Sequence, residues 1–385
     1  MKRLAVILSH PVQYYSPVFQ LLAARGKIDI KVFYTVGTAA ASKYDSGFGK
    51  DIEWDIPLLE GYAYEFLENT AKKPGLHHFG GIKNPDARAA IEKFDPDALL
   101  VYGWNYQSHL DLMRFFKKKI KILFRGDSTL IDTKTVWRRW MRSFGLKRVF
   151  SHVDLALYVG KENKDYFLQF GLKEEQLVFV PHAIDNARFA QDRKAEANSL
   201  RRRFGIKEND ILALFAGKLE SKKDPSTLIE AFSRLDQRHH QLLIVGNGLL
   251  EEGLKQQAKT KGFSNVSFID FQNQSMMPVV YQAADLFCLP SQGPGETWGL
   301  AVNEAMAAGI AVLVSDKAGC ARDLVHEGVN GYTFRSGDVE GLAEKLNVMM
   351  SSPQKLSEMG KASRSIICEW SFERQVSAIE SVLYA

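Results

Sequence analysis

The chain has 385 residues, which predicts two or three domains, because a typical domain contains about 150 residues. Hydrophobic residues make up 45% of the chain and charged residues 25%, a composition that is typical of folded proteins and excludes collagen-like, coiled-coil and disordered chains. The net charge is +5, and the positive excess is concentrated between Arg114 and Arg148, where twelve Lys or Arg residues accompany two Asp residues.

Two further features bear on the cellular location of the chain. No apolar run approaches the roughly 20 residues that a membrane-spanning helix needs, and the short apolar run after Arg3 favours a buried strand over a signal peptide. The three cysteines, Cys288, Cys320 and Cys368, are far apart, which argues against a disulfide framework and against a zinc site. We therefore expect a cytoplasmic protein.

Short apolar runs alternate with helix-like stretches along the chain, a pattern typical of strand–helix units around a parallel sheet. The ten predicted strands are 4–8, 30–34, 98–102, 121–124, 155–159, 212–216, 242–245, 266–269, 286–289 and 311–314. Two sets of five strands predict an α/β fold with two Rossmann-like, doubly wound domains, and a turn signal places their boundary at 181–185. Ligands bind beyond the carboxyl ends of such strands, so two facing domains would form a cleft there.

The residues that follow two strands of the second half suggest an anion site. Gly217 precedes Lys218 and Lys223, and two ammonium groups close to a glycine are suited to one anion; a solvated basic turn is the alternative. The Gly-Asn-Gly run at 246–248 begins like a dinucleotide-binding fingerprint, but Glu251 occupies the place of the third glycine. A tight turn under a ligand explains that run.

A loop rich in Gly and Pro, at 290–300, follows the strand 286–289 and leads into a predicted helix at 301–308. The start of this helix offers free N–H groups and a positive dipole end, which suit a phosphate. Glu296 and Glu304 are eight residues apart, and each carboxylate would accept hydrogen bonds from neighbouring hydroxyls. The alternative for Glu296 is an exposed loop acid, and the alternative for Glu304 is a first-turn acid that stabilises the helix dipole. Together with the two lysines, these parts predict a nucleotide-sugar site.

The second half of the chain closely resembles the donor half of family 4 glycosyltransferases, whose fold is GT-B. The matching residues are Phe215 to Leu219, Val245 to Gly248, Tyr281 to Asp285, Pro290 with Ser291, Glu296 with Glu304, Trp298 to Leu300, Glu304 to Ala307, Ser315 with Asp316, and Gly328 to Gly331. The resemblance implies an acceptor domain at 1–185, a nucleotide-sugar domain at 186–365, and a last helix within 366–385 that crosses back onto the first domain. Its apolar face would consist of Val376, Ile379, Val382 and Leu383.

The resemblance also implies roles for the residues of the donor site. Lys218 and Lys223 would bind the diphosphate; most members have Arg at the first position, and Lys keeps the charge without the bidentate geometry. Glu304 would hold the ribose hydroxyls, Glu296 the hydroxyls of the transferred sugar, and the segment around Phe271 would face the base. The complete predicted donor site is Gly217, Lys218, Lys223, Gly246, Asn247, Gly248, Phe271, Glu296, Thr297, Trp298, Gly299, Leu300 and Glu304. Among these, Lys218, Lys223 and Glu296 are the predicted catalytic residues.

The implied reaction is a hexosyl transfer of class EC 2.4, from a UDP- or GDP-linked sugar to a hydroxyl, with retention of configuration. In the usual scheme the leaving phosphate accepts the proton of the acceptor, so the protein supplies positioning and charge stabilisation rather than a nucleophile. No Asp-x-Asp motif follows a strand, so we expect no metal ion, and no cofactor besides the donor substrate. A nucleotide-sugar 2-epimerase of the same architecture is the alternative activity, and a non-catalytic sugar-binding protein is a third.

The acceptor side is expected in the first half, at the ends of its strands. The segment 9–17 stands where family members often have a Gly-rich loop, and a lone histidine at a strand end is also a common structural residue. His109 lies within a predicted helix rather than at the strand end where many members have a histidine. The acceptor-side candidates are His10, Gln13, Tyr14, Trp104, Asn105, Arg125 and Asp127.

The segment 137–148 mixes aromatic and basic residues at near-helical spacing. One interpretation is an interfacial helix on anionic lipid, so that the protein is peripheral on the cytoplasmic face of a membrane and acts in polysaccharide or lipopolysaccharide biosynthesis. The alternative is that Trp137, Met141 and Phe144 pack inward beneath a solvated Arg face. The expected partners are a nucleotide-sugar donor, a glycan or lipid-linked acceptor and, under the first interpretation, an anionic membrane surface; no nucleic acid is expected.

Overall fold

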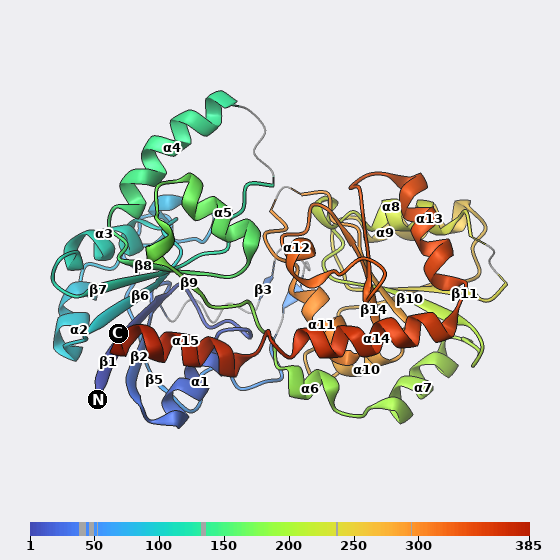
Figure 1. Cartoon of the computed structure of the whole chain (residues 1–385), viewed down its shortest axis with the longest axis horizontal. Helices are drawn as coiled ribbons and strands as arrows, with labels where there is room; N and C mark the ends of the chain where they lie inside the picture. Colours follow the sequence, from blue (N-terminus) through green and yellow to red (C-terminus); the bar gives the residue numbers. More distant parts are fainter. Residues whose placement is uncertain (38–43, 46–49, 52, 132–135, 236–237, 294) are drawn as a thin grey trace. The chain divides into compact units, whose positions relative to one another are not determined.

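The computed structural model describes residues 1–37, 44–45, 50–51, 53–131, 136–235, 238–293 and 295–385, and these residues divide into two units (Figure 1). The first unit comprises Met1–Ser42, Pro57–His182 and Phe372–Ala385. The second unit comprises Lys43–Ile56 and Ala183–Ser371. The segment Lys43–Ile56 therefore groups with the second unit, although the sequence analysis assigned it to the first domain.

The first unit is built on a parallel sheet of seven strands, in the order β5-β2-β1-β6-β7-β8-β9. Its strands are β1 (Lys2–Leu8), β2 (Ile28–Tyr34), β5 (Ala63–Phe66), β6 (Ala98–Tyr102), β7 (Lys121–Arg125), β8 (Leu155–Tyr158) and β9 (Leu177–Phe179). Its helices are α1 (Ser16–Arg25), α2 (Ala87–Phe94), α3 (Gln107–Phe116), α4 (Val136–Phe150), α5 (Lys161–Gln169) and α15 (Phe372–Tyr384), with short 3-10 turns at Phe79–Gly81 and Glu174–Gln176.

The second unit contains a parallel sheet of six strands, in the order β12-β11-β10-β13-β14-β15. Its strands are β10 (Ile211–Ala216), β11 (His240–Val245), β12 (Val266–Ile269), β13 (Leu286–Leu289), β14 (Ala311–Ser315) and β15 (Gly331–Phe334), besides the antiparallel pair β3 (Tyr44–Asp45) and β4 (Lys50–Asp51). Its helices are α6 (Asn186–Ala190), α7 (Lys194–Arg203), α8 (Pro225–Phe232), α9 (Glu251–Thr260), α10 (Met277–Gln282), α11 (Leu300–Ala308), α12 (Ala321–Leu324), α13 (Val339–Met350) and α14 (Pro353–Ile367), with the 3-10 turn η4 at Ser221–Lys223.

All ten predicted strands are present. The prediction of five strands in each sheet is wrong, because the two main sheets have seven and six strands. In the two main sheets the strands that were not predicted are β5, β9 and β15, and each is an edge strand; the short pair β3 and β4 was not predicted either. Central strands such as β6 and β10 are buried along their whole length, whereas β5 and β9 have no fully buried residue. Strand β9 has only three residues, and β5 and β15 have four residues that include Glu65 and Thr333, so none of them carries the longer apolar run by which a parallel strand is identified.

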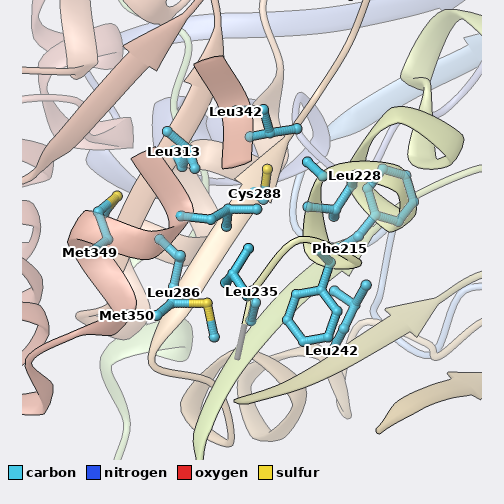
Figure 2. Packing of buried hydrophobic residues seen from close by; sticks show 14 of the residues in the cluster. Phe215, Leu228, Leu235, Leu242, Leu286, Cys288, Leu313, Leu342, Met349 and Met350 are labelled. Atoms are coloured by element: carbon cyan, nitrogen blue, oxygen red, sulfur yellow. The ribbon is translucent and has the colours of Figure 1, made fainter. Parts of the chain in front are cut away.

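The core of the second unit lies between its sheet and helices α8 and α13 (Figure 2). Phe215, Leu286 and Leu313 come from three neighbouring strands and pack with Leu228 of α8 and Leu342 of α13. All five side chains are buried, which holds the strand ends in a fixed register beneath the loops that follow them. The loop after β10 ends at a capped helix, because Asp224 accepts a hydrogen bond from the Thr227 backbone N–H at the start of α8.

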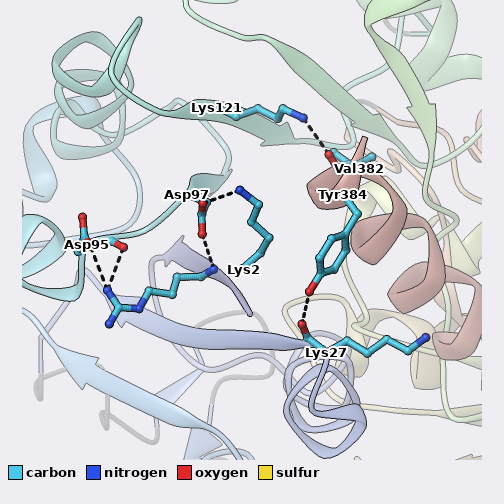
Figure 3. Close-up of polar contacts among 8 residues, drawn as sticks. Lys2, Lys27, Asp95, Asp97, Lys121, Val382 and Tyr384 are labelled. Carbon is cyan, nitrogen blue, oxygen red and sulfur yellow. Dashed lines mark hydrogen bonds and ion pairs between the residues drawn. The ribbon is translucent and has the colours of Figure 1, made fainter.

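The last helix, α15, packs in the first unit, where its predicted apolar positions are buried against α1 and the sheet. Figure 3 shows two polar contacts that fix its end: Tyr384 Oη donates to the Lys27 carbonyl at 2.5 Å, and Lys121 Nζ donates to the Val382 carbonyl at 3.0 Å. The buried carboxylate of Glu380 lies 3.3 Å from cationic nitrogens of both Arg25 and Lys27. The C-terminal helix is therefore part of the first unit, although it is remote in sequence from the rest of that unit.

Candidate functional site

The predicted donor residues follow four neighbouring strands of the second unit. Gly217, Lys218 and Lys223 come after β10, residues 246–248 after β11, Phe271 after β12, and residues 296–300 after β13. Because the strands are parallel and lie side by side in the order β12-β11-β10-β13, their carboxyl ends share one edge of the sheet. The structure therefore brings these segments to one edge, as the sequence predicts.

Lys223 and Glu296 form a buried ion pair at this edge. The Lys223 Nζ atom lies 2.5 Å from Glu296 Oε2, and only 16% and 8% of the two side chains are exposed. The Ser291 hydroxyl donates to the same carboxylate oxygen at 3.0 Å. Glu296 is thus not an exposed loop acid, which excludes that alternative. A buried charge needs such partners, and a ligand that offers oxygens to Lys223 and hydroxyls to Glu296 would supply new ones.

The loop after β11 packs directly on the loop after β10. A Cβ atom at Gly246 would lie 2.0 Å from the Gly217 carbonyl oxygen, and one at Gly248 would lie 2.5 Å from the Leu219 carbonyl oxygen. Both glycines also have positive φ values, of 136° and 157°. These two glycines are therefore needed for close contact between two loops. That contact explains them without a dinucleotide-binding fingerprint.

Asn247 ties the same loop to the one that carries Phe271. Its side-chain amide donates to Glu251 Oε2 at 2.9 Å and to Asp270 Oδ1 at 3.1 Å. Its side-chain oxygen accepts a hydrogen bond from the Phe271 backbone N–H at 2.8 Å. Glu251, which replaces the third glycine of the fingerprint, is thus part of the network that positions Phe271.

Helix α11 begins beside Glu296 and carries Glu304. Gly299 precedes the helix with a left-handed backbone, and a Cβ atom there would lie 3.8 Å from Glu296 Oε1. Glu304 is the fifth residue of the helix and is buried, so it is not a first-turn acid. The Tyr281 hydroxyl of α10 donates to Glu304 Oε2 at 2.8 Å. Trp298 is also buried and donates from its indole to Asn303 Oδ1 at 2.8 Å, so its ring positions the helix start from within the fold.

The acceptor-side candidates of the first unit also come together at one edge. His10 follows β1, Trp104 and Asn105 follow β6, and Asp127 follows β7, and these three strands are neighbours. Asn105 is exposed, whereas the others and the two candidates ahead of α1, Gln13 and Tyr14, are half-buried. His10 Nδ1 lies 2.9 Å from the Ser9 hydroxyl, and burial lowers the pKa of His10, which favours the neutral imidazole.

Arg125 is the one acceptor-side candidate that the structure removes from the surface. It is the last residue of β7, is only 2% exposed, and donates to the Val180 and Pro181 carbonyls at 2.8 and 3.2 Å. The prediction that Arg125 faces an acceptor is therefore wrong, because its guanidinium holds the backbone that follows β9. Burial, with a smaller contribution from Arg125, also holds the pKa of the neighbouring His182 well below its usual range.

His109 has a structural place as well. It lies in α3, fully buried, with Nδ1 at 3.1 Å from the carbonyls of Tyr102 and Gly103 and Nε2 at 2.9 Å from the Thr35 hydroxyl. Burial lowers the pKa of His109 to about 4, so the ring is neutral at pH 7. Two carbonyls near Nδ1 require the proton there, and the ring joins the ends of two strands.

The basic segment of α4 is described only in part. The side chains of residues 137–142 lie outside the described residues, so the structure does not place Trp137, Arg138, Arg139, Met141 or Arg142. Phe144 is 79% exposed, which contradicts the alternative interpretation in which it packs inward. Within the described ranges, no helix is long and apolar enough to span a membrane. Nor do the residues in those ranges include a group of three His, Cys, Asp or Glu side chains placed to hold a metal ion.

Comparison with solved structures identifies the class of protein that has this fold. The Anabaena protein HepE, solved with UDP and glucose, matches the whole of both chains with a TM-score of 0.75 at 18% identity. Sucrose-phosphate synthase from Thermosynechococcus elongatus matches with a TM-score of 0.75 at 16% identity, covering 100% of this chain and 98% of that one. The chain has the α/β GT-B fold of glycosyltransferases.

Sequence comparison finds a family match over part of the chain. A family model described as "Glycosyl transferases group 1" matches residues 196–366. The GDP-mannose-dependent alpha-(1-6)-phosphatidylinositol monomannoside mannosyltransferase of Mycolicibacterium smegmatis is 27% identical over 227 residues, which cover 57% of this chain and 59% of that protein. The match thus spans less than two thirds of this relative's length. The region that matches the family model contains every predicted donor residue.

Three residues of this region were not singled out as site residues from the sequence. Ser291 and Tyr281 donate to the two glutamates, and both stand in segments that resemble the family, so their hydroxyls were a usable signal. Trp54 lies against Phe271 although it is more than 200 residues away in sequence. Nothing in the local pattern around Trp54 indicates that contact.

Proposed function

We propose that the protein is a retaining glycosyltransferase that moves a sugar from a nucleoside diphosphate to a hydroxyl of a glycan or a lipid-linked acceptor. The observation that carries this proposal is the buried pair of Lys223 and Glu296, set beside the start of α11 within the region that matches the family model. A cation, the N–H groups at a helix start and buried carboxylates are the groups that a diphosphate and sugar hydroxyls require.

In the proposed donor complex, Lys218 and Lys223 bind the diphosphate together with the backbone amides of residues 297–300. Glu304 accepts hydrogen bonds from the ribose, and Glu296 from the transferred sugar. As the bond between the anomeric carbon and the phosphate oxygen breaks, the acceptor oxygen bonds to that carbon and its proton passes to the leaving phosphate. Lys223 then stabilises the charge that grows on the diphosphate, which accelerates the step without a protein nucleophile.

The activity is tested with the full chain and a panel of UDP- and GDP-linked sugars, with and without candidate acceptors. We expect transfer from one of these donors, and we expect the anomeric configuration of the product, measured by NMR, to equal that of the donor. A 2-epimerised nucleotide-sugar formed without any acceptor would instead support the epimerase. The relatives reported above are named as transferases or solved with UDP and glucose, which favours transfer.

The acceptor belongs, in this proposal, to polysaccharide or lipopolysaccharide biosynthesis, and the protein binds the cytoplasmic face of a membrane through α4. Phe144 is exposed on that helix, and the side chains of Lys147 and Arg148, which follow it, are exposed as well. Each basic residue near an anionic surface contributes about 1 kcal/mol, and the attraction weakens as salt shortens the Debye length from about 10 Å at 0.1 M. Binding to anionic vesicles is therefore expected to fall with salt.

Vesicle co-sedimentation tests this part. Replacing Arg138, Arg139, Arg142 and Lys147 with Gln is expected to abolish binding to anionic vesicles and to leave nucleotide affinity unchanged. A matched variant replaces four exposed lysines elsewhere in the first unit with Gln, namely Lys72, Lys73, Lys83 and Lys93, and should keep most of the binding. Absence of wild-type binding to anionic vesicles at low salt would contradict the membrane proposal alone.

A further inference from the structure

A segment from the first half of the sequence is fastened to the second unit beside Phe271. Asn273 donates from its side chain to the Glu53 carbonyl at 2.6 Å and accepts from the Asp55 backbone N–H at 3.4 Å. The Asp55 carboxylate in turn accepts from the Ser275 backbone N–H at 3.2 Å and from the Ser275 hydroxyl. These bonds join residues 53–55 to the loop between β12 and α10 on both sides of Trp54, so the tryptophan is held at that loop.

Trp54 and Phe271 form an edge-to-face aromatic pair in this place. Their ring centroids are 6.0 Å apart with an angle of 70° between the planes, and both residues are half-buried, so neither is enclosed in the core. The Phe271 backbone is fixed by Asn247, which belongs to the loop that packs on Gly217. A continuous set of contacts therefore links the aromatic pair to the loop that bears Lys223.

The spacing of the sheet places the pair at a useful distance from the proposed diphosphate site. Phe271 follows β12, and Lys223 follows β10, two strands away. Neighbouring strands are about 4.8 Å apart, so the two strand ends are separated by roughly 10 Å. That separation is comparable with the length of a nucleoside diphosphate from its base to its terminal phosphate.

We propose that Trp54 adds a second aromatic side chain to the base site that the family resemblance implies at Phe271, with Asp55 as a positioning residue that holds Trp54 in place. The proposal rests on the proposed function, because it assumes a nucleoside diphosphate on Lys218 and Lys223. Every nucleobase has a flat π face that stacks on aromatic rings, and removing one stacking ring commonly costs about 1–3 kcal/mol, or roughly 5- to 150-fold in affinity. A residue of the first half of the chain thus contributes to the site of the second unit.

The test compares the binding of UDP, GDP and inorganic pyrophosphate to the full chain by calorimetry. Trp54→Ala is expected to raise the Kd of the preferred nucleoside diphosphate at least fivefold and to leave the Kd of pyrophosphate unchanged. Trp54→Phe should recover most of the loss, because it restores an aromatic face. Asp55→Ala should lower nucleotide affinity by a smaller factor and likewise spare pyrophosphate. Tyr64→Ala removes a part-exposed aromatic side chain of the first unit and serves as the matched control.

Each outcome decides between the two proposals. If the wild type binds nucleoside diphosphates and Trp54→Ala binds them equally well, the aromatic pair is only a packing contact and this inference is wrong, while the proposed function stands. If Trp54→Ala weakens pyrophosphate as much as nucleotide, the damage is general and the base-specific role is refuted. If the wild type binds no nucleoside diphosphate at all, the proposed function fails, and this inference fails with it.

Discussion

The two units use the same parallel-strand scaffold, yet they treat the polar side chains near their strand ends differently. In the second unit these side chains bond to one another across loops, as Lys223 does with Glu296 and Tyr281 with Glu304. In the first unit, the buried Arg125 and His109 contact mainly backbone carbonyls, with the Thr35 hydroxyl as a further partner of His109. The comparison teaches that a polar residue near a strand end is identified as functional by its partners and not by its location.

The two units differ because a ligand is able to replace the bonds of some side chains and not those of others. A side-chain pair such as Lys223 and Glu296 presents a cation and an anion whose bonds a phosphate and a hydroxyl would substitute. A side chain bonded to buried carbonyls has no such freedom, because its removal leaves those carbonyls without partners. The second unit therefore holds exchangeable contacts, and the first unit holds contacts that maintain its fold.

The largest effect is expected from Lys223→Ala. Loss of a cation that stabilises the growing charge of the diphosphate should lower kcat/KM by about 10²- to 10³-fold, mainly through kcat. Lys222→Ala is the matched control, since Lys222 lies in the same turn, is more exposed and pairs with Glu220. Steady-state kinetics of both variants measure the contrast, and equal losses would argue against a specific role for Lys223.

The buried His109 makes the first unit sensitive to acid. Its pKa of about 4 lies below the value of about 6.5 in an unfolded chain, so the unfolded state binds a proton more readily as the pH falls below 6.5. Between pH 7 and pH 5 this residue should lower the free energy of unfolding by about 2 kcal/mol. Denaturant titrations of the wild type and of His109→Gln at both pH values measure the difference. An identical pH dependence of the two proteins would show that His109 titrates normally.

A further effect on stability is expected where the two loops of the second unit meet. Gly246→Ala places a methyl group against the Gly217 carbonyl in a left-handed backbone and should destabilise the protein by about 1–3 kcal/mol. Gly253→Ala is the opposite case, because Gly253 lies within α9 with no atom within 4 Å, and it should stabilise by about 0.5–1 kcal/mol. Thermal unfolding distinguishes the two signs, and a neutral Gly246→Ala would mean that the loops separate easily.

The sequence was most informative where burial is continuous. The central strands carry unbroken apolar runs, and the donor-site loops carry spaced lysines and glutamates, so both were predicted. The edge strands β5, β9 and β15 have only three or four residues, and β5 and β15 each include a polar residue, so they leave a weaker pattern. The contact of Trp54 with Phe271 and the burial of Arg125 depend on chain segments that meet only in the folded structure. No local sequence pattern therefore predicts them.

The central claim is that the strand ends of the second unit bind the nucleotide-sugar donor, and a crystal structure of the full chain saturated with UDP or GDP tests it most directly. We predict that diphosphate oxygens will lie within hydrogen-bond distance of the ammonium groups of Lys218 and Lys223 and of the amides at 298–300, with the ribose at Glu304. A diphosphate bound elsewhere, for example at His10 and Trp104 in the first unit, would contradict the account.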